Sequence, residues 1–391
     1  MKRYFADLHI HIGRTVSNKP VKITASDQLT FANIIEEAHT RKGIDIVGIV
    51  DCASPPVMED IGQLINEGAL EDLSGGGYLY QGRTLVILGV EVEIHVQGYG
   101  TGHFLCYFDQ LSTMKEFSQW LAQYTTNIQL STQLTRVPLR DLQQRVKQSA
   151  GLFVPAHIFT PHKGLYGNMT ACMAEILDVN AVDAVELGLS ADTFMAARLK
   201  ELHGMTMLAN SDAHSLAKIA REYNELQMES LSFAGLAKAL HKIGSNRVLA
   251  NYGMEPRLGK YHRSFCLACS TIAGEDDAPP IYSCPQCKSE NMTIGVLDRI
   301  VHIAGSDQMQ FSPQQQYHYQ IPIEFIPGIG RKTLNKLYDH FGTEMNILHQ
   351  VPYAQLAEVV GAKLATAIES GRTGKIKVNS GGGGIYGNVQ I

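Results

Sequence analysis

Short apolar runs and amphipathic segments alternate along the first 250 residues. An extended segment at 2–12 is followed by apolar runs at 44–50, 84–90, 102–107, 152–156 and 205–209. Such runs are typical of parallel strands that are buried on both faces. Apolar residues recur at helical spacing in the stretches 113–126, 138–149 and 191–203. Strands that alternate with helices predict a parallel α/β barrel, whose functional groups gather at the C-terminal ends of the strands.

Asp7, His9 and His11 occupy alternate positions of the first extended segment, so strand geometry places all three on one face. Two imidazoles on one face provide half of a metal site, although a polar strand end could also contain them. Further acids and histidines follow the later apolar runs, namely Asp51, Glu91, His103, His157, Asp212 and His214. Each could be a turn residue or a helix cap. Their recurrence at equivalent places predicts a shared metal site.

Composition and charge limit the class of protein. The chain has 391 residues, of which 45% are hydrophobic and 18% charged, as in soluble globular proteins of two or three domains. No apolar run approaches the roughly 20 residues that span a bilayer, and Met1-Lys2-Arg3 leads into a polar strand without a signal peptide. We therefore expect a cytoplasmic protein with no membrane partner.

The formal net charge of -5 argues against a broad nucleic-acid surface. Only residues 320–391 are net positive, with seven basic and five acidic side chains. Any contact with DNA is therefore expected to be local.

Seven cysteines fall into two groups. Cys52, Cys106 and Cys172 are scattered and read as reduced thiols. The other four form two C-x-x-C pairs, Cys266 with Cys269 and Cys284 with Cys287. Two such pairs with a short spacer predict a closed, structural four-thiolate zinc site, the alternative being four unrelated cysteines.

A glycine hairpin follows at residues 326–334. Gly328 and Gly330 flank an apolar residue, and Arg331 and Lys332 open a predicted helix, which resembles a helix-hairpin-helix motif. Glycines let the backbone approach a phosphate, and the helix N-terminus offers free N–H groups. The alternative is an ordinary turn between helices. We expect a barrel at 1–252, a zinc module at 253–312, a DNA-binding hairpin region at 313–378 and a flexible glycine-rich tail at 379–391.

The ordered ligand series resembles the polymerase and histidinol phosphatase (PHP) superfamily over about residues 1–250. It comprises Asp7-Leu8-His9-Ile10-His11, Val50-Asp51, Glu91, Gly102-His103, Pro155-Ala156-His157 and Ser211-Asp212-Ala213-His214. The resemblance implies a distorted seven-stranded β/α barrel with two or three divalent metals for phosphoester hydrolysis. By position, one metal would be held by His9, His11, Glu91 and Asp212, and Glu91 would bridge to a second held by His103 and His157. His214 would belong to a third site.

The chain departs from the three-metal pattern of this superfamily. Residues 13–17 lack the usual further histidine, and Cys52 follows Asp51 where three-metal members have Thr-Asp-His. A third metal, if bound, would therefore rest on Asp51 and His214. The expected metals are zinc, manganese or magnesium, and the mixed ligand set suits zinc, manganese or iron better than magnesium alone. A metal pair about 3.5–4 Å apart would clamp the scissile phosphate, with Glu91, Asp212 and His214 as the catalytic set.

Barrel, zinc module and hairpin in this order resemble the endonuclease Q family to about residue 378. That resemblance implies incision of double-stranded DNA 5′ to a damaged nucleotide: deoxyuridine, deoxyinosine, deoxyxanthosine or an abasic site. Sensing an altered base requires its removal from the stack. We expect Phe159 and Tyr166, in the loop after His157, to wall the lesion pocket, although an ordinary surface loop would also contain them.

Two other functions fit part of the sequence. A small-molecule phosphatase, such as a histidinol-phosphate hydrolase, would use the same metals but would not need the hairpin. A non-catalytic DNA-binding protein with a decayed barrel would need the hairpin but would not keep Glu91 and Asp212 beside the histidines. No segment identifies a sliding-clamp partner.

Overall fold

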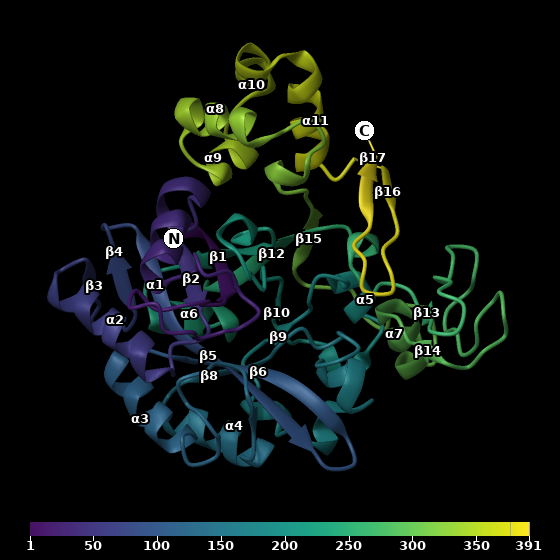
Figure 1. The fold of residues 1–391 in the computed structure, drawn as a ribbon, viewed down its shortest axis with the longest axis horizontal. Coiled ribbons are helices and arrows are strands. Elements are labelled where there is room, and N and C mark those ends of the chain that lie inside the picture. The colour runs from purple at the N-terminus through teal and green to yellow at the C-terminus, as the bar shows by residue number, and fades with distance from the viewer. Residues whose placement is uncertain (376, 391) are drawn as a thin grey trace.

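The computed structural model describes residues 1–375 and 377–390. Its largest sheet contains β1 (Lys2–Ile10), β2 (Ile46–Ile49), β3 (Leu70–Asp72), β4 (Tyr78–Tyr80), β5 (Thr84–Val96), β6 (Gly100–Phe108), β7 (Leu134–Thr135), β8 (Leu152–Pro155), β11 (Tyr223–Met228), β12 (Arg247–Gly253) and β15 (Gln316–Tyr319). Three short pairs complete the strands: β9 (Val185–Glu186) with β10 (Met207–Leu208), β13 (Phe265–Cys266) with β14 (Met292–Thr293), and β16 (Lys377–Asn379) with β17 (Asn388–Gln390). The α/β class predicted from the sequence is confirmed (Figure 1).

The α-helices are α1 (Phe31–Glu37), α2 (Pro55–Asn66), α3 (Leu111–Leu121), α4 (Leu139–Gln148), α5 (Thr193–Ala196), α6 (Phe233–Leu240), α7 (Val296–Ala304), α8 (Arg331–Phe341), α9 (Glu344–His349), α10 (Tyr353–Val360) and α11 (Ala362–Arg372). Short 3-10 and π turns are η1 (Ala38–Lys42), η2 (Leu165–Met169), η3 (Met173–Glu175), η4 (Val179–Ala181), η5 (Lys200–Leu202), η6 (Leu216–Lys218), η7 (Pro256–Leu258) and η8 (Ile323–Phe325). The predicted helices at 113–126 and 138–149 correspond to α3 and α4. The one predicted at 191–203 is wrong, because that stretch holds only the short α5 and η5. In the described part of the chain, no helix is long and apolar enough to cross a membrane.

The strands that carry the site follow one another around a common core. β1 pairs with β2, and β2 with β5, in parallel, whereas β6 is antiparallel to both β5 and β8. The prediction of a parallel barrel is therefore wrong at β6, and also at β11, which is antiparallel to β1 and β12. Only residues 97–99 connect β5 to β6, and a parallel crossover needs a far longer connection. Beyond β8, β9 and β10 lead back to β1, where the Ala213 amide donates to the His9 carbonyl at 3.2 Å.

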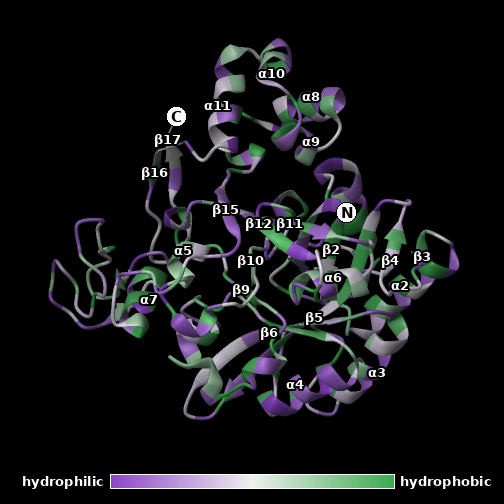
Figure 2. Ribbon diagram, turned by 180° about the vertical axis from the view of Figure 1, so that it is seen from behind, coloured by the Kyte–Doolittle hydropathy of each residue, from purple (hydrophilic) through white to green (hydrophobic). Residues whose placement is uncertain are grey.

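The core explains the continuous apolar runs. Val47 and Ile49 belong to one buried cluster, whereas Ile46 and Leu85 belong to another on the opposite face of the strands. Both faces of these strands are therefore covered, which removes the polar alternation of a half-exposed sheet. The outer helices α3 and α4 carry both hydrophilic and hydrophobic stretches (Figure 2), as expected of helices that bury one face only.

Two further modules are built onto the barrel. Helices α8 to α11 form a unit at one end of the molecule, and β13, β14 and α7 lie at its side (Figure 1). The connection between them is not a free linker, because β15 pairs in parallel with β12 of the barrel sheet.

The expectation of a flexible tail is wrong for its described residues. β16 and β17 form an antiparallel hairpin, and the glycines between them bond to the segment before β13. Gly381 N donates to Arg257 O at 2.7 Å, and Gly387 N donates to Leu258 O at 2.9 Å.

Candidate metal centre

The first ligand group combines the end of β1 with the loop after β10. His9 and His11 are buried, and their Nε2 atoms face each other at 3.2 Å. The Asp212 Oδ1 atom lies 3.7 Å from His9 Nε2 and 3.4 Å from His11 Nε2. Asp7, their neighbour in the sequence pattern, instead accepts hydrogen bonds from the backbone amides of Ser211 and Ala220. It therefore shapes the loop that carries Asp212 and does not join the ligand group.

The second group comes from the β5–β6 hairpin and the loop after β8. Glu91 Oε1 lies 2.8 Å from His103 Nδ1 and 3.4 Å from His157 Nε2. The same oxygen lies 3.4 Å from His9 Nε2, and Glu91 Oε2 lies 3.5 Å from His11 Nε2. One carboxylate thus touches both groups, as a bridging ligand between two metals would.

The donor set fits a pair of divalent metals. Within each of the two groups, one ligand atom per residue lies within 4.8 Å of the others. Imidazole nitrogens that face each other at 3.2–3.3 Å, as in the His9–His11 and His103–His157 pairs, cannot both carry protons there. A shared cation between them resolves that conflict, and imidazole with carboxylate is a ligand set suited to zinc or manganese.

Carboxylates behind the ligands orient three of the imidazoles. His9 Nδ1 lies 2.8 Å from Glu186 Oε2, His103 Nε2 lies 2.8 Å from Glu93 Oε2, and His11 Nδ1 lies 3.0 Å from Asp51 Oδ2. Partners of this kind fix the tautomer and the ring direction of metal-binding histidines.

Two of these carboxylates were not identified from the sequence. Glu186 ends a strand of two residues that leaves no recognisable apolar run, and Glu93 shares the face of Glu91 two positions along β5. The period-two rule that grouped His9 with His11 could have identified Glu93.

Asp51 does not take the place predicted for it. Its carboxylate accepts hydrogen bonds from His11 Nδ1, from Ile12 N at 2.6 Å and from the Ser131 hydroxyl. These donors hold Asp51 behind His11, and it belongs to neither of the two ligand groups. His214 lies at the edge of the first group, with its ring centroid 4.6 Å from that of His11 and its Nδ1 atom 3.0 Å from Asp212 O.

Two ligands have unusual backbone conformations. The φ angles of His157 and Asp212 are 28° and 46°, in the left-handed region that residues with a Cβ rarely adopt. Strain of this kind persists where the surrounding structure enforces it, often at functional sites. Gly188 contributes to this packing, because a Cβ there would lie 2.8 Å from His157 Cβ.

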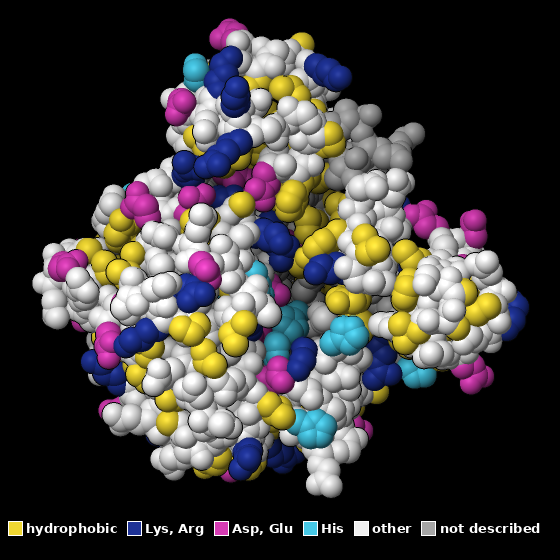
Figure 3. Space-filling model, in the orientation of Figure 1, with side chains coloured by type: hydrophobic (Ala, Val, Ile, Leu, Met, Phe, Trp, Pro, Cys, Tyr) yellow, Lys and Arg dark blue, Asp and Glu magenta, His cyan; other side chains and the backbone are white. Residues whose placement is uncertain are grey.

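The ligand groups lie at the base of a cleft of about 610 Å³. Figure 3 shows His, Lys, Arg and acidic side chains gathered in this hollow. The cationic groups that line it are Lys22, Lys163, Lys218, Arg221 and Lys260. A narrow hollow with acidic and imidazole groups at its base and cations around its walls suits a metal-bound phosphate group.

Charges in the cleft set the ionisation of the ligands. Burial raises the pKa of Glu91, but His103 and Lys22 outweigh it and hold this pKa well below its ordinary value. Asp212 behaves in the same way, because the nearby imidazoles overcome the effect of burial on its pKa. Burial and the charge of His11 lower the pKa of His214 to about 4. Near neutral pH the two carboxyl groups are ionised and His214 is neutral.

The predicted lesion-pocket residues do not line the cleft. Phe159 and Tyr166 are 1% and 0% exposed, and their rings stack on each other with centroids 5.7 Å apart. Tyr166 also donates a hydrogen bond to Glu201. They are core residues that no base can reach, so that prediction is wrong. The aromatic rings that line the cleft belong to Tyr261 and Tyr386.

Tyr386 lies in the glycine-rich hairpin that was expected to be a tail, yet it is connected to the metal loop. The Arg221 guanidinium donates to Tyr386 Oη at 3.3 Å and to Ser211 O at 2.7 Å. Lys260 Nζ lies 4.7 Å from the centroid of the Tyr386 ring.

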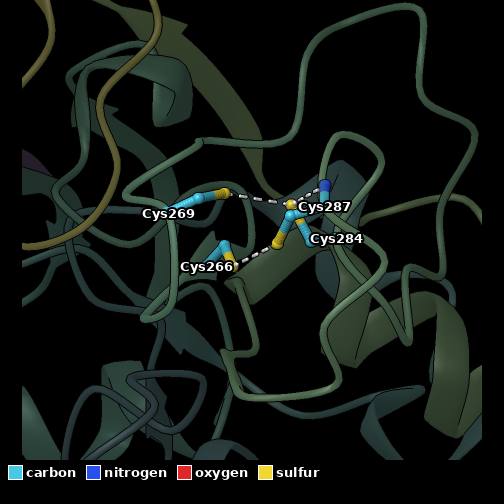
Figure 4. Close-up of side chains that lie close together, drawn as sticks. All are labelled: Cys266, Cys269, Cys284 and Cys287. Atoms are coloured by element: carbon cyan, nitrogen blue, oxygen red, sulfur yellow. Dashed lines mark hydrogen bonds between the residues drawn. The ribbon is translucent and has the colours of Figure 1, made fainter.

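The four paired cysteines meet as predicted (Figure 4). The Sγ atoms of Cys266 and Cys287 are 3.6 Å apart, and those of Cys269 and Cys284 are 3.5 Å apart. Four thiols converging on one point can close a tetrahedral site around a zinc ion.

The glycine hairpin lies on the surface of the α8–α11 unit. Gly328 has a φ of 89°, and Gly330 is the N-cap of α8, with Arg331 and Lys332 exposed in its first turn. A Cβ on Gly330 would meet nothing within 4 Å, so packing does not demand this glycine. Gly361, which is also exposed, has a φ of 83° and caps α11, which packs against α10.

The chain is similar to a known family model, to a bacterial protein and to two solved structures. Residues 192–243 match the family model described as PHP-associated. The uncharacterized protein YqxK of Bacillus subtilis is 44% identical over 100% of both chains. The crystal structure of the lesion-specific endonuclease PfuEndoQ from Pyrococcus furiosus is 29% identical, with a TM-score of 0.83 over 100% of this chain and 96% of that one. The same score and identity hold for an endonuclease Q complex with a 27-mer duplex carrying an abasic lesion at its active site, of which 97% is covered.

Proposed function

Since the chain belongs to the endonuclease Q family, we propose that it is a metal-dependent DNA repair endonuclease that hydrolyses the phosphodiester 5′ to a damaged nucleotide. The proposed lesions are deoxyuridine, deoxyinosine, deoxyxanthosine and an abasic site. The observation that carries the proposal is the contact of Glu91 with both ligand groups at the base of a cation-lined cleft. A non-catalytic DNA-binding protein would not require such an arrangement.

Six side chains are proposed to hold two metals in the barrel: His9, His11 and Asp212 for one, His103 and His157 for the other, with Glu91 shared. When bound, the metals would supply Lewis acidity and water activation for in-line phosphodiester hydrolysis. The four cysteines would hold a structural zinc.

The remaining residues of the cleft would orient the substrate and handle protons. Lys218 and Lys260 line the cleft and offer ammonium groups to the backbone phosphates on either side of the cut. His214 Nδ1 faces a carbonyl oxygen, so it carries the proton and leaves Nε2 free to accept one. Because its pKa is lowered to about 4, that imidazole is neutral at neutral pH and is a weak base, so its part would be to accept a hydrogen bond.

The α8–α11 unit is proposed to grip the duplex away from the lesion. The hairpin at Gly328 and the N-terminus of α8 expose backbone N–H groups, and Arg331 and Lys332 add charge. Gly361 and α11 would offer a second such turn. Phosphate contacts of this kind add affinity without sequence preference, which suits an enzyme that must scan intact DNA.

The extruded nucleotide is proposed to lie between the metals and the rings of Tyr261 and Tyr386. Tyr386 is 38% exposed, so a base could stack on its accessible part. This location replaces the one predicted at Phe159 and Tyr166.

Incision mapping tests the function. The protein with Mn²⁺ is incubated with end-labelled duplexes that differ only in one nucleotide: intact, uracil, hypoxanthine, xanthine or abasic. We expect a cut 5′ to each lesion, none in the intact duplex, and none by Glu91→Ala. Uniform cutting of all duplexes would refute lesion specificity. Hydrolysis of histidinol phosphate without any DNA cleavage would favour a small-molecule phosphatase.

A further inference from the structure

The third metal implied by the superfamily resemblance would have to share Asp51 with other hydrogen-bond partners. Asp51 already accepts hydrogen bonds from His11, Ile12 and Ser131, and residues 13–17 contain no histidine. Next to the same ligands lies a cation that belongs to the protein, the ammonium group of Lys22. Its Nζ atom donates to Glu91 Oε2 at 3.0 Å, on the carboxylate that contacts both ligand groups.

The fold holds Lys22 in that position. Its backbone amide donates to Ile12 O at 2.9 Å, which returns the loop after β1 to the strand that carries the histidines. On the other side, the amide of Ser131 donates to Val21 O at 3.0 Å and brings residues 131 and 132 over the cleft. The Lys22 side chain is 13% exposed, so this is not a solvated surface ion pair.

Thr132 also contacts the Lys22 ammonium group. Lys22 Nζ donates to Thr132 Oγ1 at 2.6 Å, and this hydroxyl donates to Glu91 Oε2 at 3.0 Å. Thr132 has a φ of 50°, an unfavourable conformation for a β-branched residue. A strained threonine that contacts both the lysine and the bridging carboxylate indicates that the fold fixes the position of the ammonium group.

We infer that the Lys22 ammonium takes the place of a third metal cation, so that the barrel binds two metals and Lys22 supplies the third positive charge. The inference rests on the metal centre of the proposed function. An ammonium group has three N–H donors, and Glu91 and Thr132 accept two of them. The third is available to an oxygen of a phosphate group bound in the cleft, which Lys22 also lines.

The consequence is a fixed charge that chelators cannot remove. A lysine cannot activate a water molecule as a metal can, so its part is to bind phosphate and to position Glu91. Lys163 provides a matched control, because its Nζ atom lies 2.8 Å from Glu93 Oε2 in the same cleft. Glu93 belongs to neither ligand group.

The first measurement is the metal content of the full-length protein. After chelation and reconstitution with Mn²⁺ and Zn²⁺, elemental analysis should give two barrel metals and one zinc in the four-cysteine site. Lys22→Arg should keep this ratio. Three barrel metals in the wild-type protein would overturn the inference, and so would fewer than two.

The second measurement is binding of inorganic phosphate to the Mn²⁺-loaded protein, followed calorimetrically. A hydrogen bond to a charged group is worth about 1.5–3 kcal/mol, so Lys22→Gln should weaken phosphate binding by about tenfold or more. Lys22→Arg should restore most of the affinity, and Lys163→Gln should have a smaller effect. Equal affinity of Lys22→Gln and wild-type protein would overturn the inference.

Neither measurement depends on DNA cleavage. Two barrel metals in a protein that makes no incision would refute the proposed function and leave the place of Lys22 intact. Three barrel metals in a protein that cuts at lesions would do the opposite.

Discussion

A buried ion pair between Lys42 and Glu344 is predicted to hold the α8–α11 unit against the barrel. Lys42 ends η1, and Glu344 begins α9, some 300 residues later in the chain. Lys42 Nζ donates to Glu344 Oε2 at 2.7 Å, and the two residues are 3% and 1% exposed. The proposed DNA contacts lie on one side of this ion pair and the metal cleft lies on the other. The ion pair is therefore expected to fix the distance between the DNA-binding hairpin and the metal centre.

The magnitude follows from burial. Lys42 also donates to Ala217 O at 2.8 Å, and Glu344 Oε2 also accepts from Tyr338 Oη at 3.2 Å, so both charges are compensated. Glu344→Gln leaves a buried ammonium group without its hydrogen-bonded counter-charge. Removing one partner of a buried pair costs about 3–5 kcal/mol. Each 1.4 kcal/mol is a factor of ten, so the unit should separate from the barrel roughly a hundredfold to a few thousandfold more often.

Hydrogen exchange measures this separation directly. In Glu344→Gln, the amides of α9 and of η1 should exchange at least about a hundredfold faster, whereas those of α3 and α4, remote from the pair, should be unaffected. Incision of a long uracil duplex should show a raised KM, because hairpin and metals are no longer held in register. The double variant Lys42→Met with Glu344→Leu removes both charges and should recover much of the protection.

Two outcomes would refute this reasoning. Exchange in Glu344→Gln within threefold of wild type would show that other contacts hold the unit in place. A double variant as unstable as the sum of the two single variants would mean that the charges do not interact.

Three further predictions concern binding, lesion choice and pH. Gly330→Val should weaken binding of damaged and intact duplexes alike by about tenfold without lowering turnover at saturating DNA, since Gly330 borders open space and the new side chain blocks only the phosphate; a loss of turnover would place the hairpin in the active site. Tyr386→Ala should reduce kcat/KM about tenfold on uracil and less on an abasic site, which offers no ring to stack; equal losses on both would contradict this role. Burial lowers the pKa of His9, but Glu186 and Asp212 raise it well above its ordinary value. The metal-free imidazole is therefore protonated below that raised pKa, so barrel metal affinity should fall as pH decreases. Calorimetry in buffers of different ionisation enthalpy should detect protons released when the metals bind. Metal binding without proton release would refute this pH dependence.

Features with a short-range pattern were predictable from the sequence. His9 and His11 are two positions apart, which is the period of a strand, and the paired cysteines have the spacing of a zinc site. Such patterns are visible in the sequence because residues close together in the chain determine the ligand geometry. The alternation of strands and helices likewise predicted the α/β class, apart from β6, where a connection of three residues forces a hairpin.

Long-range packing decided the features that were missed. Phe159 and Tyr166 stand among glycines and a proline, which suggested a surface loop, yet their rings enter the core and Tyr166 meets Glu201. Lys22 has no motif around it. Its role depends on Glu91 and Thr132, which lie 69 and 110 positions away. The local sequence around Lys22 does not predict a contact between residues so far apart in the chain.

The glycine run at 381–384 shows why composition misled about the tail. Glycine-rich segments are expected to be flexible, because each residue has wide conformational freedom. Here close packing requires the glycines: a Cβ on Gly381 would lie 2.5 Å from Gly387 N, and one on Gly383 would lie 2.6 Å from the Phe265 ring. The run allows the hairpin to lie flat against the zinc module, which brings Tyr386 to Arg221 at the edge of the metal cleft. A segment that reads as a disposable end of the chain therefore forms part of the wall of the candidate active site.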